Sequence, residues 1–233
     1  MSFSVHADAW LSEVMRRPVF RVQGSGDTGE LSSHIAAQPS AFYFAKVSTD
    51  RVADVFALAE QRFAVVDTNV TFELKRELDA PASFDVGEIR AGEEDAVLAI
   101  AGSTFRYSRF HLDPVVGLEL AHHVKREWIA NYVKRVRGDA LLVARENGRP
   151  VGFLAAIMAH DTAVIDLVGA ANDMHGKGVG SALTAAFAHR YRGMPRIVGT
   201  QIANVPSIRL YTKLGFVLSK SAYVLHLHHN RGG

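Results

Sequence analysis

The chain has 233 residues, of which 48% are hydrophobic and 21% are charged. That length and composition suit one large domain, or a domain with a smaller unit, and exclude disordered, collagen-like and coiled-coil proteins. The 26 Lys and Arg residues and the 24 Asp and Glu residues leave a formal net charge of only +2. We therefore expect neither nucleic acid nor a membrane surface as a partner.

The sequence contains no cysteine. Disulfides, thiolate nucleophiles and cysteine-ligated metal sites are therefore excluded, and any catalysis must use oxygen or nitrogen side chains. No segment approaches the ~20 apolar residues of a membrane span, and the first residues lack the basic-then-apolar order of a signal peptide. We expect a soluble, cytoplasmic protein.

The first 80 residues are predicted to form a partial α/β unit. Residues 1–40 are weakly patterned, with glycine- and serine-containing stretches that we interpret as loops. Apolar spacing then predicts a small unit of a strand, a helix and a second strand, at residues 41–47, 52–63 and 62–74. A linker is expected at residues 78–83, before a second domain at residues 84–233.

The second domain is predicted to be a mixed α/β structure that ends in the order helix, strand, helix, strand. Residues 103–114 are rich in arginine and aromatic side chains, which is typical of a loop that faces a ligand. A strand and a helix are predicted over residues 84–102. The further predicted strands are residues 140–145, 150–159, 162–170, 196–202 and 216–228, and the further helices are residues 118–136, 181–191 and 206–215.

A glycine cluster, GKGVG at residues 176–180, connects a predicted strand to a predicted helix. Consecutive backbone N–H groups at a helix N-terminus converge on a phosphate, and glycine lets the anion approach closely. The spacing matches neither the Walker motif nor GxGxxG, so a purely structural turn is the alternative.

Three polar residues follow on one side of the last predicted helix. Asn204, Ser207 and Tyr211 are spaced i, i+3 and i+7, which places them on one helix face. A tyrosine phenol, with a pKa of about 10, can protonate a departing thiolate, whose thiol has a pKa of about 8.5. The alternative is a tyrosine that only packs in the core.

These two segments together resemble the GCN5-related N-acetyltransferase (GNAT) superfamily, whose members transfer an acetyl group from acetyl-CoA to an amine. AVIDLVGAANDMHGKGVGSAL resembles its acetyl-CoA signature and TQIANVPSIRLYTKLGF the segment that follows, and the resemblance covers residues 84–225. It implies a mixed, mostly antiparallel sheet with a V-shaped split near Val168 and Thr200. This chain has His175 where the superfamily usually has Gln or Arg.

The resemblance also implies the roles of individual residues. Acetyl-CoA is the co-substrate, no metal is needed, Tyr211 protonates the leaving thiolate, and backbone N–H groups near Val168 and Gly169 hold the oxyanion. The residues implied to contact acetyl-CoA are Leu167, Val168, Gly169, His175, Gly176, Lys177, Gly178, Val179, Gly180, Ser181, Asn204 and Ser207.

A narrower resemblance is to TDP-fucosamine acetyltransferases, which acetylate the 4-amino group of a TDP-linked 4-amino-4,6-dideoxyhexose. It rests on the TQ…N…Y…GF…SxAY run, the SRFHLDP loop and the small N-terminal unit. It implies Asp67 as the general base, with Asp166 and a water chain as alternatives. The implied acceptor residues are Arg106, Tyr107, Arg109, Phe110, Thr200 and Gln201, although the arginine-rich loop also fits a solvated basic surface.

Other readings of the sequence stay open. The acceptor could be another small amine, such as an amino acid, a polyamine or an antibiotic, and a non-catalytic acyl-CoA sensor is the alternative from a different class. A homodimer is possible. We expect no metal: adjacent His122 and His123 point in different directions on a helix, and no carboxylate or cysteine lies near enough in the sequence to complete a site with His226, His228 and His229.

Overall fold

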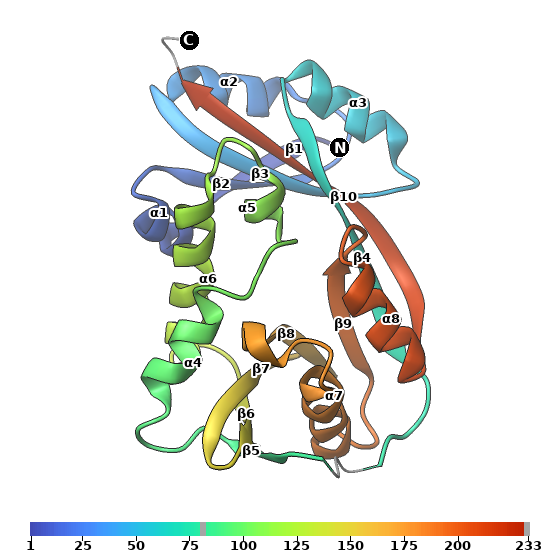
Figure 1. Cartoon of the computed structure of the whole chain (residues 1–233). Helices are drawn as coiled ribbons and strands as arrows, with labels where there is room; N and C mark the ends of the chain where they lie inside the picture. Colours follow the sequence, from blue (N-terminus) through green and yellow to red (C-terminus); the bar gives the residue numbers. More distant parts are fainter. Residues whose placement is uncertain (80–82, 231–233) are drawn as a thin grey trace.

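The computed structural model describes residues 1–79 and 83–230. Its described strands form one ten-stranded sheet in the order β1-β2-β3-β10-β4-β9-β8-β7-β6-β5, with helices on both faces (Figure 1). Only the β2–β3 and β8–β9 neighbours are parallel, and the other described pairs are antiparallel. The prediction of a mixed, mostly antiparallel sheet is therefore confirmed.

Strands and helices alternate only in the first and last parts of the chain. The strands are β1 (Phe3–Ala7), β2 (Val19–Gly24), β3 (Ser40–Ser48), β4 (Ala64–Leu74), β5 (Asp85–Glu88), β6 (Ala140–Glu146), β7 (Arg149–Ala159), β8 (Thr162–Ala170), β9 (Arg196–Gln201) and β10 (Phe216–Asn230). The helices are α1 (Ala9–Met15), α2 (Gly29–Ala37), α3 (Val52–Glu60), α4 (Glu94–Ala101), α5 (Arg109–Leu112), α6 (Leu118–Val133), the 3-10 helix η1 (Asn172–Met174), α7 (Val179–Arg190) and α8 (Val205–Lys213).

Residues 1–40, in which the sequence shows only weak patterning, contain β1, α1, β2 and α2. The sequence signal is weak for a physical reason: α1 has only seven residues and buries only Leu11 and Met15, which is too few positions for a visible period. A capping contact starts this helix instead, since the Asp8 side chain accepts a hydrogen bond from the Leu11 amide at 2.9 Å.

The C-terminal strand joins the two halves of the sheet. β3 and β4 do not pair with each other, because β10 lies between them and runs across to the N-terminal strands (Figure 1). Strands from residues 1–80 and from residues 84–233 therefore share one sheet, and the division into two domains stays a prediction. The expected linker lies partly outside the described residues, which omit residues 80–82.

Strict alternation along β10 separates the two faces of the sheet. Leu225 and Leu227 pack into a core with α2 and α3, whereas His226 and His228 point to the opposite face. Helices α7 and α8 cover the same face as α2 and α3, further along the sheet, and α1, α4, α5 and α6 cover the other face. Each half of each face has its own apolar cluster.

The predicted V-shaped split is confirmed between β8 and β9. These strands pair only from Ala163↔Arg196 to Ile165↔Val198, although β8 continues to Ala170 and β9 to Gln201. The next residue of β8, Asp166, is the extra residue of a β-bulge against β7. Because a bulge bends its strand and increases the local twist, it accounts for the divergence that begins there.

We expect Gly152→Ala to lower the free energy of unfolding by about 1–3 kcal/mol, the usual cost of overpacking. A Cβ atom on Gly152 would lie 2.5 Å from Val179 Cγ1 and 2.8 Å from the Gly169 carbonyl oxygen, so α7 would have to move away from β7. Gly87→Ala is the control, because its nearest neighbour would be 3.8 Å away. Urea denaturation of both variants measures the difference, and equal midpoints would contradict this account.

Candidate active site

The split opens into a cavity of about 600 Å³. Most of its lining comes from β2, β3, β4, β8 and β9 together with α5, α6 and α8. Because the sheet is interrupted here, the cavity reaches both faces: Tyr211 belongs to the core beside α7 and α8, whereas Arg109 and Lys125 come from helices on the other face. Groups from opposite faces therefore meet in one space.

Asp67 lines this cavity. It is the last of three residues that lie side by side on neighbouring strands of the sheet. Val224 on β10 pairs with Lys46 on one side and with Asp67 on the other. The Asp67 side chain is buried, and neither carboxylate oxygen has a hydrogen-bond partner among the described residues. Burial raises the pKa of Asp67 to about 6, and the Thr68 amide and the Lys46 charge oppose this rise only in part.

The predicted polar face of α8 is brought together in the cavity. Asn204 caps the helix: its side chain accepts a hydrogen bond from the Ser207 amide at 3.3 Å and donates one to Thr200 Oγ1 at 3.2 Å. Two turns further on, Tyr211 is 2% exposed and packs against aromatic rings of the core. Burial raises the pKa of Tyr211 well above its ordinary value, so its phenol stays protonated.

The glycine loop precedes α7 at the end of β8. Gly176 and Gly178 have φ angles of 78° and 91°, which glycine adopts without strain. The first amide that bonds inside the helix is that of Ala182, to the Gly178 carbonyl, so the amides before it are free of intrahelical bonds. His175 is exposed, with Nε2 at 3.0 Å from Thr104 Oγ1 and 3.2 Å from the Ala170 carbonyl oxygen.

Asp166, the alternative base, is held by three donors. Its Oδ2 accepts hydrogen bonds from Trp128 Nε1 at 2.8 Å, the Tyr132 hydroxyl at 2.6 Å and Arg137 Nε at 2.9 Å. Burial alone would raise the pKa of Asp166, but these bonds lower it. The carboxylate thus ties α6 to the bulge of β8.

Two cationic side chains face the cavity from the helical side. The guanidinium carbon of Arg109 lies over the rings of Phe44 and Phe110, at 4.0 and 4.3 Å from their centroids. Lys125 is 7% exposed, and its ammonium lies 5.0 Å from the Trp128 ring centroid. Burial lowers the pKa of Arg109 to about 10; burial and the charge of Arg109 lower that of Lys125 to about 8.

The predicted acceptor residues separate into two groups. Arg109, Phe110, Thr200 and Gln201 line the cavity, whereas Arg106 and Tyr107 are exposed and are not among its lining residues. Sequence reasoning missed Lys125. The signal was present, because Lys125 lies on the face of α6 that otherwise carries the apolar residues of the core. A lysine there must be compensated or functional.

Comparison with known proteins identifies the family. Residues 95–216 match the Acetyltransferase (GNAT) family. The chain belongs to the GNAT acetyltransferase family. It is therefore an acetyl-CoA-dependent N-acetyltransferase, as the glycine loop and the segment around Tyr211 predict.

Individual GNAT relatives are distant in sequence. Spore coat polysaccharide biosynthesis protein SpsD of Bacillus subtilis is 24% identical over an alignment of 233 positions, which covers 94% of this chain and 80% of the relative. A GCN5-related N-acetyltransferase from Sphaerobacter thermophilus has a TM-score of 0.66 at 13% identity, over 99% of this chain and 78% of that chain. One from Kribbella flavida has a TM-score of 0.61 at 17% identity, over 93% and 82%. No helix among residues 1–79 and 83–230 of this GNAT protein is long and apolar enough to cross a membrane.

The expectation that no carboxylate lies near the C-terminal histidines is wrong. Asp113 Oδ2 lies 2.6 Å from His226 Nδ1 and 2.8 Å from His228 Nε2. The other ring nitrogens face guanidinium groups: Arg109 Nη1 lies 3.1 Å from His226 and Arg17 Nη2 lies 3.0 Å from His228. Three ligand-type atoms thus lie within 4.8 Å of one another, but two guanidiniums on the same rings oppose the binding of a cation.

We expect this GNAT protein to lose stability as the pH falls from 6.5 to 4. Burial lowers the pKa of His226 to about 4, with Asp113 opposing and Arg109 adding to the shift. His226 therefore binds a proton more readily in the unfolded chain than in the folded one. The free energy of unfolding should fall by roughly 3 kcal/mol across this pH window. His226→Gln should show a shallower loss in urea titrations at each pH, relative to wild type.

The exposed His123 supplies the control for that measurement. His123→Gln should retain the wild-type slope. The raised pKa of Asp67 changes the free energy of unfolding with pH in the opposite direction, because the fold favours the neutral carboxyl. Asp67 is present in all three proteins, so its contribution cancels when they are compared. Identical slopes for His226→Gln and wild type would contradict the assignment.

Proposed function

We propose that acetyl-CoA enters the split from the side of α7 and α8. Its pyrophosphate would bind the amides of residues 176 and 178–181, where the positive end of the helix dipole adds to the attraction; the Lys177 amide already donates to the Met174 carbonyl oxygen. Its pantetheine arm would pair with the free edge of β8 beyond Ile165, since those backbone groups have no partner from β9. The thioester carbonyl would then lie against the amides near Val168 and Gly169.

The acceptor amine would enter from the face of α5 and α6 and attack the thioester directly. Asp67 takes the proton from the amine, the new C–N bond forms as the C–S bond breaks, and Tyr211 protonates the departing thiolate. The single observation that supports this most is that Asp67 and Tyr211 line the same cavity. We favour Asp67 over Asp166 as the base because three hydrogen bonds hold the latter in its ionised form.

For the acceptor we propose a nucleotide-linked amino sugar, such as a TDP-linked 4-amino-4,6-dideoxyhexose. The name of the Bacillus subtilis relative places that protein in polysaccharide biosynthesis. The cations that line the cavity, among them Arg109 and Lys125, suit an anionic sugar nucleotide and disfavour a polyamine. Thiol release from acetyl-CoA tests this with the sugar nucleotide beside amino acids, polyamines and aminoglycosides; turnover with another amine alone would discard the sugar assignment.

Replacing Tyr211 with Phe should lower kcat by about 10²- to 10⁴-fold, the usual contribution of a general acid. The ring still packs against Phe72 and Phe216, so the affinity for acetyl-CoA should be unchanged. Steady-state kinetics and calorimetry measure the two quantities. Tyr191→Phe, at the end of α7, is the matched control. A variant at Tyr211 with wild-type kcat would rule out its role as the acid.

The pH profile separates the two carboxylates. If Asp67 is the base, kcat/KM falls as the pH drops below about 6, because the carboxyl becomes protonated there. Asp67→Asn should lower kcat/KM by about 10²- to 10⁴-fold and remove this acid limb. Asp166→Asn should instead destabilise the fold and keep the limb. Loss of the limb only in the variant at Asp166 would reverse the assignment.

A further inference from the structure

We propose that Arg109 and Lys125 form an oxyanion-binding subsite inside the cavity, which binds a phosphate or carboxylate group of the acceptor. The inference rests on the proposed function, because it takes this face of the cavity to be the acceptor side. It assigns the anion to two named residues, one of which, Lys125, is not among the acceptor residues predicted from the sequence.

Arg109 is fixed in place without a counter-ion. The guanidinium carbon lies over the rings of Phe44 and Phe110, and Nη1 contacts the ring of His226. Contacts of this kind with aromatic rings leave the N–H groups of the guanidinium other than those bound to His226 available for an oxyanion. Asp113, a nearby carboxylate, is already bound by both histidines, and no carboxylate of the described residues forms an ion pair with Arg109.

Lys125 is more deeply buried and also lacks a counter-ion. Its ammonium lies over the rings of Phe105 and Trp128, at 5.3 and 5.0 Å from the centroids. Within residues 1–79 and 83–230 it makes no hydrogen bond or ion pair. The acidic group on this side, Asp166, is satisfied by three donors that include the charged Arg137.

A pair of buried cations without an anion is costly for a protein to maintain. Burial lowers the pKa values of both groups, and repulsion by the charge of Arg109 lowers that of Lys125 further. An oxyanion placed between them would reverse both effects, because it replaces lost hydration and supplies the missing charge. Strongly perturbed groups that face a cavity are the usual mark of a binding site.

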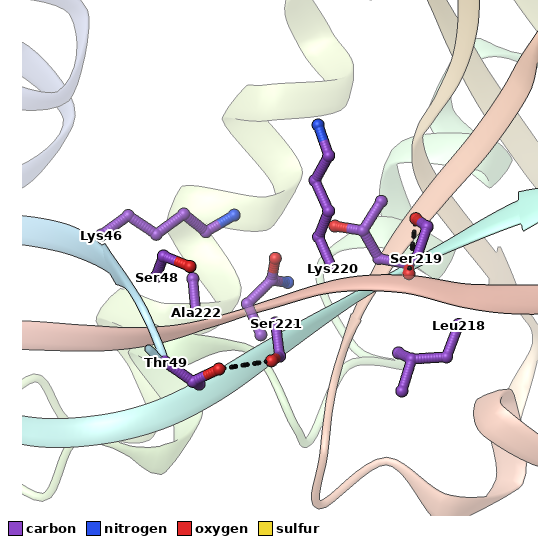
Figure 2. Close-up of a pocket in the computed structure, with 10 residues that line it drawn as sticks. Lys46, Ser48, Thr49, Leu218, Ser219, Lys220, Ser221 and Ala222 are labelled. Atoms are coloured by element: carbon purple, nitrogen blue, oxygen red, sulfur yellow. Dashed lines mark hydrogen bonds between the residues drawn. The ribbon is translucent and has the colours of Figure 1, made fainter. Parts of the chain in front are cut away.

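The cavity also has an entrance that favours anions. A neighbouring groove on β3, β4 and β10 shares Lys46, Asn69 and Thr71 with the cavity lining, so the two are continuous. Figure 2 shows that groove, which is lined by Lys46 and Lys220 together with serine and threonine side chains. Two exposed lysines at the entrance raise the local concentration of an anionic acceptor.

Titration calorimetry with CoA-saturated protein tests the subsite, since CoA fills the phosphate site at α7. The phosphate probes are inorganic pyrophosphate and TDP, with thymidine as the neutral match, and the carboxylate probe is glucuronate, with glucose as its neutral match. We expect one charged probe to bind and its neutral match not to bind. Lys125→Gln and Arg109→Gln should each weaken that binding by about 10- to 100-fold, the value of a charged hydrogen bond.

Arg126→Gln is the control. Arg126 is the exposed neighbour of Lys125 on α6, and its replacement by Gln removes the same positive charge. It should bind the probe as wild type does. Thermal unfolding of each variant checks that the fold is retained, and Lys125→Arg should restore binding lost in Lys125→Gln. Absence of binding by every charged probe, or equal binding by all variants, would overturn the proposal.

Kinetics distinguishes this inference from the proposed function. With an acetylated anionic acceptor, Lys125→Gln should raise the KM of the acceptor and leave the KM of acetyl-CoA unchanged. If no amine is acetylated but the charged probe binds as expected, the subsite stands and the assigned reaction fails. If an amine is acetylated and both variants keep its KM, the reaction stands and the subsite is overturned.

Discussion

The loss of pairing between β8 and β9 is the constraint on which the rest of this enzyme depends. Both strands lie in the middle of the sheet, where each backbone group normally has a partner. The bulge at Asp166 ends that pairing after Ile165 and Val198. A central sheet of this kind otherwise separates its two faces completely, so the split is what allows one cavity to contain side chains from both.

The charged residues around the split differ in whether they form ion pairs. Asp166 forms an ion pair with Arg137 and accepts hydrogen bonds from two neutral donors on α6. These hydrogen bonds also attach α6 to β8 beside the split. Asp67, Arg109 and Lys125 remain without ion pairs among the described residues. Folding alone would favour apolar residues at such positions, since each of these groups costs stability when buried. Their retention is consistent with a site whose partners arrive with the ligand.

Residue patterns with a short period were predictable. The helical spacing of Asn204, Ser207 and Tyr211 places them on one face, and the structure has them along one side of the cavity. The strands from residue 41 onward were also foreseen, since alternation over many residues is a strong signal. Helix α1 and the strands around it were missed because a seven-residue helix with two buried positions leaves no period to detect.

By itself, the sequence determined the family, the order of the strands after residue 41 and the local geometry of the glycine loop and α8, because these depend on neighbours within a few residues. Only the tertiary structure decided that β10 lies between β3 and β4, which places Asp67 opposite Val224. It alone brought Asp113 to His226, across 113 residues of chain, and Lys125 to the cavity. Such contacts follow from strand order and helix packing, which no local spacing encodes.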